Sequence, residues 1–308
     1  MRIDSLTYFN TSLYGMRENQ ASIARLTQQL GADRSVLQPK DDPIATDRIL
    51  DLSARVATRT QMAANQDRAA FALNYETTVL LEMQKTMDSV RSALVGVQPS
   101  NDAGYRESIA NSLDGFANQL LDLANTRDPA GNYIFGGFNT VDKPYDHPFD
   151  GLGTTATTYL GTPYPDGTRS IEVDVGRLIQ VNDNLDGVFQ SGTADNDLLR
   201  ELDDAVAKLR NDATPPTQQE LLDWITLVDG AIRTLDDIAY RTAAAYGEVE
   251  DVRTTTKALL VQEQNALHDV SALDKEEAIL SLQLRQTTLE ATQRAYAKIS
   301  GLSLFNFL

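Results

Sequence analysis

Residues 6–30 read LTYFNTSLYGMRENQASIARLTQQL, and the spacing of their apolar side chains decides the fold that we expect. The positions of interest are separated by alternating steps of three and four residues, which is the seam of a helix that packs along another helix. A glycine follows at position 31, where helices commonly end. The segment therefore predicts one helix whose narrow contact stripe consists of Leu6, Phe9, Leu13, Met16, Gln20, Ile23, Thr27 and Leu30.

The other end of the chain carries a matching pattern. Leu282, Leu289 and Tyr296 recur every seven residues, and Ile299 lies beside them. The last residues form an apolar tip, although a chain end is normally polar and frayed; this tip includes Leu304, Phe305 and Phe307. We expect the first and last helices to lie antiparallel at one end of an elongated rod.

Further helices follow the first one. Asp42 precedes Pro43, which is the pattern of an N-cap with proline at the first helical position, and a helix is expected from there to about residue 97. A second helix fits residues 105–126, with a cap near Asp102.

The amino-acid composition changes between residues 129 and 192, which are rich in proline, glycine and aromatic residues. We expect strands at residues 154–160 and 169–175, joined by a turn at residues 165–168. Helices resume near residue 195, and a capping box at Thr217 and Glu220 begins a pattern that continues without proline almost to the C-terminus.

The expected fold class is mainly α with a β-rich insert, namely an elongated antiparallel helical bundle or coiled coil with a small outer β domain. Residues 1–42 and 270–308 are predicted to be the terminal helices. Residues 43–130 and 188–269 are predicted to form the bundle. The β-rich insert spans residues 131–187 and is expected at the end of the rod away from the termini.

Charge is distributed unevenly along the 308 residues, whose formal net charge is -17. The first 40 residues hold five basic and three acidic side chains, and residues 274–308 hold four of each, so the middle carries the acidic excess. Acidic surfaces repel nucleic acids and anionic lipids. We therefore expect no nucleic-acid partner and no membrane partner. The near-neutral ends suit segments that are packed inside an assembly, because burying unpaired charge is costly.

We find no constellation of catalytic or metal-binding residues. The chain has no cysteine, and its two histidines, His147 and His268, lie far apart in sequence; we expect His147 in a solvated turn. Residues 182–187 loosely match a calcium loop, but Thr193 stands where a bidentate glutamate is required. We therefore expect no enzyme, no cofactor and no metal.

Two features bear on the cellular location. No stretch approaches the roughly 18 consecutive apolar residues of a membrane span. The N-terminal residues also lack the basic-then-apolar order of a cleaved secretory signal. Any export is expected to use another route.

Three motifs resemble those of the bacterial flagellin-like axial proteins. QPKDDPIA at residues 38–45 is similar to the start of that family's second helix. GNYIFGGF at residues 131–138 and YAKISGLSLFNFL at residues 296–308 are similar to its passage into an outer β domain and to its C-terminal tip. The loop at residues 31–34 departs from the family because it is poorer in serine and glycine than is usual in flagellin.

The resemblance implies a structural adaptor at the junction of the flagellar hook and filament. It implies export through the flagellar channel, a ring of identical protomers, contact with a preceding hook-associated protein and with flagellin, and an export chaperone over the C-terminal helix. A flagellin-type filament subunit is one alternative, and a cytoplasmic coiled-coil adaptor is another. The predicted assembly interface consists of Leu6, Phe9, Leu13, Met16, Ile23, Leu30, Leu282, Leu289, Tyr296, Ile299, Leu304, Phe305 and Phe307.

Overall fold

The computed structural model describes residues 2–162, 167–189, 197–211 and 213–305. Within these ranges the chain divides into two compact units. The terminal unit comprises Met1–Arg59 and Ala258–Leu308, and the central unit comprises Thr60–Lys257. The long helices α2 (Pro43–Val95) and α6 (Gln218–Ser271) each contribute to both units.

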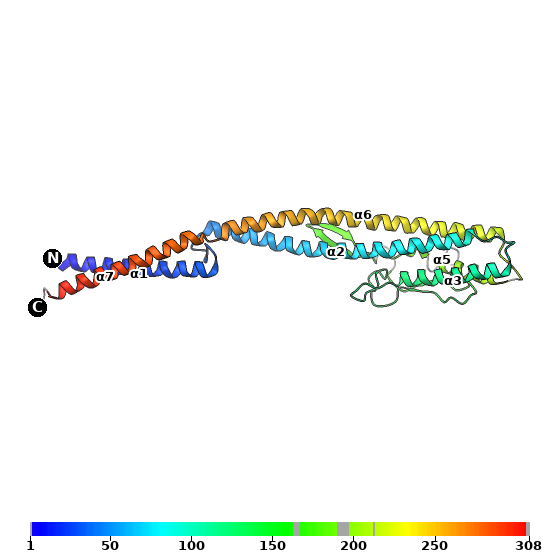
Figure 1. The fold of residues 1–308 in the computed structure, drawn as a ribbon, viewed down its shortest axis with the longest axis horizontal. Coiled ribbons are helices and arrows are strands. Elements are labelled where there is room, and N and C mark those ends of the chain that lie inside the picture. The colour runs from blue at the N-terminus through cyan, green and yellow to red at the C-terminus, as the bar shows by residue number, and fades with distance from the viewer. Residues whose placement is uncertain (1, 163–166, 190–196, 212, 306–308) are drawn as a thin grey trace. The chain divides into compact units, whose positions relative to one another are not determined.

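The terminal unit contains the two end helices, α1 (Arg2–Ala32) and α7 (Lys275–Phe305), together with the outer parts of α2 and α6. Figure 1 shows α1 and α7 side by side. The antiparallel pairing of the end helices is thereby confirmed. No helix among the described residues has the length and apolar character that a membrane crossing would need.

The helix ends follow local capping chemistry in most places. The Asp42 carboxylate accepts the backbone N–H groups of Ile44 and Ala45 at 3.0 and 2.9 Å, which confirms the predicted start of α2. Asp102 caps α3 (Ala103–Ala124). Thr217 and Glu220 form the reciprocal box that begins α6.

Two predicted helix ends are wrong. The first helix does not end at Gly31 but continues to Ala32, and Asp33 takes the left-handed conformation with φ 54°. The C-terminal helical pattern is also interrupted, because α6 ends at Ser271 and α7 begins at Lys275. Asp274 caps the new helix by accepting the Glu277 N–H at 3.0 Å, and the sequence holds no glycine or proline there to announce the break.

The core of the central unit is formed by α2, α3, α5 (Leu198–Arg210) and α6, with α4 (Asp186–Phe189) against one edge. Apolar side chains from these helices are completely buried at helical spacing; they include Leu80, Met83, Met87, Leu94, Leu113 and Leu120. This is the only large described core in the chain.

The β-rich insert contains two small antiparallel hairpins. One pairs β1 (Tyr145–Asp146) with β2 (Thr158–Tyr159), and the other pairs β3 (Ser170–Asp174) with β4 (Arg177–Gln180). The strand predicted at residues 169–175 is confirmed, whereas only Thr158–Tyr159 of the segment 154–160 is strand. Residues 165 and 166 of the predicted turn lie outside the described residues.

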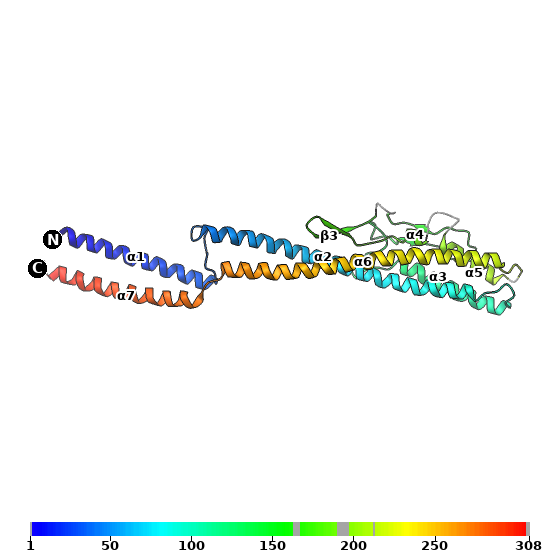
Figure 2. The same cartoon turned by 90° about the horizontal axis from the view of Figure 1, so that it is seen from above.

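The insert lies beside the helices of the central unit and not past their ends. Figure 2 shows it along one flank of α2 and α6. The buried Val173 of β3 packs with Leu73 of α2 and Val249 of α6 in a second small core, near the end of the unit where α2 enters it. The two-residue and five-residue strands cannot bury enough apolar area alone, so the hairpin uses the helix pair as its other half.

Candidate assembly interface

The predicted interface lies on α1 and α7, and these helices are held together by few polar contacts. Arg285 Nη1 donates to Asn19 Oδ1 at 3.4 Å, and Lys275 Nζ lies 2.9 Å from Asp33 Oδ2. Lys275 begins α7 and Asp33 follows the end of α1, whereas Arg285 and Asn19 lie in the middle parts of the two helices, as antiparallel packing requires. Exposed ion pairs of this kind contribute little to stability, so apolar contact must hold the pair.

On α1, the predicted stripe is only partly correct. Leu13, Met16, Ile23 and Leu30 are half-buried, but Gln20 and Thr27 are exposed. The contact face instead includes Leu26 and Gln29; Gln29 is buried because its Nε2 donates to the Ser35 carbonyl at 2.5 Å. The buried face of α1 therefore differs in part from the positions that the heptad alone selects.

On α7, Leu282, Leu289 and Tyr296 are half-buried as predicted for a packed face. Ala278 is the single buried hydrophobic residue that the structure describes in the terminal unit. Leu6, Phe9, Ile299, Leu304 and Phe305 belong to the two helices, but their side chains are not among those described. Phe307 lies outside the described residues.

The structure shows a second apolar stripe on α7, of which the sequence pattern indicated only Leu284 and Ala291, as residues that flank the predicted seam. Leu280 and Leu284 are each 67% exposed, on the face opposite Ala278. Thr287 and Ala291 continue this face at helical spacing and are also exposed. The signal was present in the sequence, because these positions form an uncharged row outside the predicted seam. Five further apolar side chains of the terminal unit are exposed, namely Tyr14, Ile44, Leu50, Val261 and Ile279.

The base of α1 and α7 is fixed at Ser35, in the loop that leads to α2. The Ser35 N–H donates to the Ser271 carbonyl at 3.0 Å, and Ser35 Oγ is 3.4 Å from the Val270 carbonyl. These carbonyls end α6 and would otherwise lack partners. Asp41 organises the same loop by accepting the N–H groups of Leu37 and Gln38. The break in the C-terminal helical pattern is therefore held by a residue more than two hundred positions away.

The histidine that was expected in a solvated turn is buried. His147 is 5% exposed, its Nδ1 lies 3.4 Å from Thr157 Oγ1, and Thr157 Oγ1 donates to Asp197 Oδ1 at 2.6 Å. Burial lowers the pKa of His147, although the nearby carboxylates of Asp197 and Asp203 oppose the shift. Asp203 also accepts the N–H groups of Gly151 and Gly153 at 3.1 Å. The cluster serves to dock residues 147–157 onto α5.

Other polar motifs also have structural roles. In the segment that loosely matches a calcium loop, Asn182 Oδ1 accepts the Arg169 N–H, and its Nδ2 donates to the Gly167 carbonyl at 3.1 Å. Across the described ranges, no group of three histidine, aspartate or glutamate side chains is arranged to hold a metal ion.

Comparisons with known proteins bear on the whole chain. The family described as "Bacterial flagellin N-terminal helical region" matches residues 3–140. Flagellar hook-associated protein 3 of Escherichia coli K12 is 25% identical over 328 aligned positions, which cover 99% of each protein. The chain is thus similar to bacterial flagellins over its N-terminal region and to flagellar hook-associated protein 3 over nearly its whole length. The protein of the same name from Salmonella typhimurium LT2 is 23% identical, again over 99% of both chains.

The fold of this flagellin-like chain also matches solved structures. A flagellar junction protein from Legionella pneumophila superposes with a TM-score of 0.58 at 14% identity, covering 73% of this chain and 99% of that one. Identity at this level supports the shared fold alone. The relatives named above are flagellar proteins, and the similarity to them covers nearly the whole chain.

Proposed function

We propose that the chain is a structural adaptor subunit at the junction between the flagellar hook and the filament. Its terminal helices pack axially against neighbouring subunits. The observation that carries the proposal is the incomplete core of the terminal unit, where Ala278 is the one described buried hydrophobic residue. Similarity to flagellar hook-associated protein 3 over 99% of both chains supports the position at the junction.

The interface in this proposal has two faces. The first is the predicted set on α1 and α7, whose described side chains are half-buried within one chain and complete their burial against neighbours. The second is the outer face of α7, with Leu280 and Leu284. A helix that is apolar on two opposite faces suits a position between other helices. Exposed apolar rows of this kind are a liability for a monomer, because they promote aggregation.

In this proposal each of the predicted segments has its own place in the assembly. Residues 1–42 and 270–308 form the inner tube of the assembly, residues 43–130 and 188–269 form the supporting bundle, and residues 131–187 provide the outer surface. The contact between Ser35 and Ser271 supports the boundary between the first two segments, because it fixes the bases of α1 and α7 at one point.

The assembly partners are flagellar proteins. In our proposal they are identical protomers in a ring, the preceding hook-associated protein and flagellin. The chain leaves the cell through the flagellar export channel. Before assembly, a chaperone covers α7, since Leu280 and Leu284 would otherwise remain in water.

The proposal is tested by placing a charge in the half-buried face. Leu13→Asp is expected to abolish filament growth and motility, because an unpaired carboxylate cannot be buried against a neighbouring helix. The central unit should stay folded, as measured by circular dichroism and thermal unfolding. The matched control is Leu178→Asp, at a leucine of the central unit that is 68% exposed, and it should leave motility unchanged.

Normal filaments in the Leu13→Asp strain would contradict the proposed interface. The alternatives are separated by location and abundance. A filament subunit would dominate protein sheared from the cell surface, whereas a junction subunit is scarce there but present in purified hook–basal bodies. A cytoplasmic adaptor would be missing from both fractions.

A further inference from the structure

Two buried polar side chains of α2 hold the β-rich insert through its backbone. Gln66 Nε2 donates to the Val173 carbonyl at 2.7 Å and to Thr256 Oγ1 of α6 at 2.8 Å. About three turns further on, Glu76 Oε1 accepts the Asp183 N–H at 2.9 Å. Gln66 is fully buried and Glu76 is 3% exposed. The insert is thus attached at one point by an amide and at the other by a carboxyl group.

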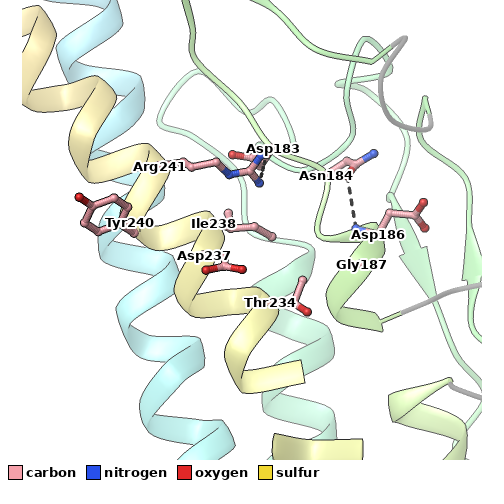
Figure 3. Close-up of a pocket in the computed structure, with 9 residues that line it drawn as sticks. All are labelled: Asp183, Asn184, Asp186, Gly187, Thr234, Asp237, Ile238, Tyr240 and Arg241. Atoms are coloured by element: carbon pink, nitrogen blue, oxygen red, sulfur yellow. Dashed lines mark hydrogen bonds and ion pairs between the residues drawn. The ribbon is translucent and has the colours of Figure 1, made fainter. Parts of the chain in front are cut away.

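The carboxyl group of Glu76 faces charges from three segments. Asp183 follows β4, Arg169 precedes β3, and Arg241 belongs to α6. Figure 3 shows Arg241 directed at Asp183, and its Nη2 lies 3.5 Å from Asp183 Oδ1. Of the two guanidinium groups that act on Glu76, the one of Arg241 is paired with Asp183.

The balance of these effects keeps Glu76 protonated near neutral pH. Burial and, to a smaller extent, the Asp183 carboxylate raise the pKa of Glu76, whereas the Asp183 N–H, Arg169 and Arg241 oppose the shift; the net result moves the pKa from 4.5 to about 8. Burial also raises the pKa of Asp183. Once the insert detaches, Glu76 is in water and its ordinary pKa returns.

Solvent has a route to this cluster. A pocket of ≈ 570 Å³ opens between the segment that contains Asp183 and the face of α6 that contains Asp237, Tyr240 and Arg241 (Figure 3). Tyr240 is 77% exposed, so the opening of the pocket is in contact with solvent. Water in this pocket allows protons to exchange with the cluster without unfolding of the helical core.

We propose that Glu76, Asp183 and Arg241 form a pH-sensitive clasp that holds the β-rich insert against α2 and α6 and weakens in alkaline solution. The docked state binds a proton that the detached state releases, so docking is fully favoured below pH 4.5 and its contribution declines as pH rises to about 8. Within this window the docking equilibrium falls by up to about tenfold per pH unit, and above it the contribution of Glu76 is constant. The Gln66 attachment carries no charge and does not respond to pH.

The test uses the natural absence of cysteine. Val173→Cys places one thiol under the docked hairpin, at a side chain that is 0% exposed. Its rate of modification by a thiol reagent is measured from pH 5 to 9 in the full chain, with and without Glu76→Gln. The ratio of the two rates cancels the pH dependence of the thiol itself.

We expect labelling without the Glu76→Gln change to accelerate relative to labelling with it, by up to about tenfold per pH unit between pH 5 and 8, and then to level off. Glu82→Gln is the matched control on an exposed part of α2 and should leave the rate unchanged. A rate ratio that stays constant across pH would overturn the clasp. Failure of Glu76→Gln to fold would also overturn it, because glutamine mimics the protonated carboxyl.

Hydrogen exchange provides an independent readout in the chain without cysteine. The Val181 N–H bonds to the Arg169 carbonyl at 2.8 Å, at the base of the hairpin beside the clasp. After correction for intrinsic rates, its protection should fall between pH 5 and 8 in the natural chain and stay constant in Glu76→Gln. Equal pH dependence in both chains would contradict the proposal.

Discussion

Leu280 and Leu284 offer a sharp test of whether the outer face of α7 acts in assembly or in the monomer. Each side chain is 67% exposed, so only about a third of its area is removed from water within one chain. A fully buried leucine contributes about 1.5–3 kcal/mol. Replacing both with alanine should therefore cost the monomer roughly 1–2 kcal/mol in total, without a penalty in helix propensity.

Assembly should respond more strongly than the monomer. If the remaining two-thirds of both side chains are buried against a neighbour, the double variant loses about 2–4 kcal/mol per subunit contact. This corresponds to a weakening of roughly 30- to 1,000-fold, because about 1.4 kcal/mol is a factor of ten. Repetition around a ring would enlarge the effect.

The assay pairs thermal unfolding of the isolated chain with the amount of the protein in purified hook–basal bodies. The comparison variant is Leu120→Ala, at a side chain that is 0% exposed in the central unit. It should cost about 2–5 kcal/mol of monomer stability. The reasoning is refuted if the double variant assembles normally, or if it destabilises the monomer as much as Leu120→Ala does.

Three further predictions concern the central unit. Lys208 and the Thr217 N–H lower the pKa of Glu220 to about 2, so its stabilising contribution is present above pH 4.5 and is lost as pH falls toward 2; Glu220→Gln should remove this dependence and lower the Tm at pH 7. Burial lowers the pKa of His147, so stability should decline as pH falls below 6.5, and a denaturant titration of His147→Gln should show a flatter profile between pH 5 and 7. At Gly153, with φ +62°, an added Cβ would lie 2.4 Å from Asp204 Cβ, so Gly153→Ala should cost at least about 1–3 kcal/mol in equilibrium unfolding; an unchanged midpoint would contradict the described packing.

Local chemistry explains why much of the fold could be predicted. The caps at Asp42 and Asp102 and the box at Thr217 depend on residues within three positions of one another, and each is present in the structure. The alternation around Val173 likewise identified β3, because a hairpin with one buried face has a period of two. The seven-residue recurrences identified the two terminal helices, because a helix that packs along another helix repeats its contact positions every seven residues.

The missed features depend on contacts between distant residues. The end of α6 is capped by Ser35, and no residue near Ser271 signals it. His147 is buried beside Thr157, whose hydroxyl contacts the histidine ring and donates to the Asp197 carboxylate. The heptad pattern does not include Gln29 among the predicted contact positions. The structure buries its side chain, which donates a hydrogen bond to the Ser35 carbonyl. None of these partners can be paired from one sequence.

Hydrogen exchange on the isolated monomer tests the central claim most directly, because an incompletely buried helix pair opens more easily than a closed core. The account predicts weak protection of the backbone amides of α1 and α7, strong protection of α2 between Leu80 and Leu94, and a large gain of protection in α1 and α7 after assembly. Protection of α1 and α7 in the monomer that equals the protection of Leu80–Leu94 would contradict it.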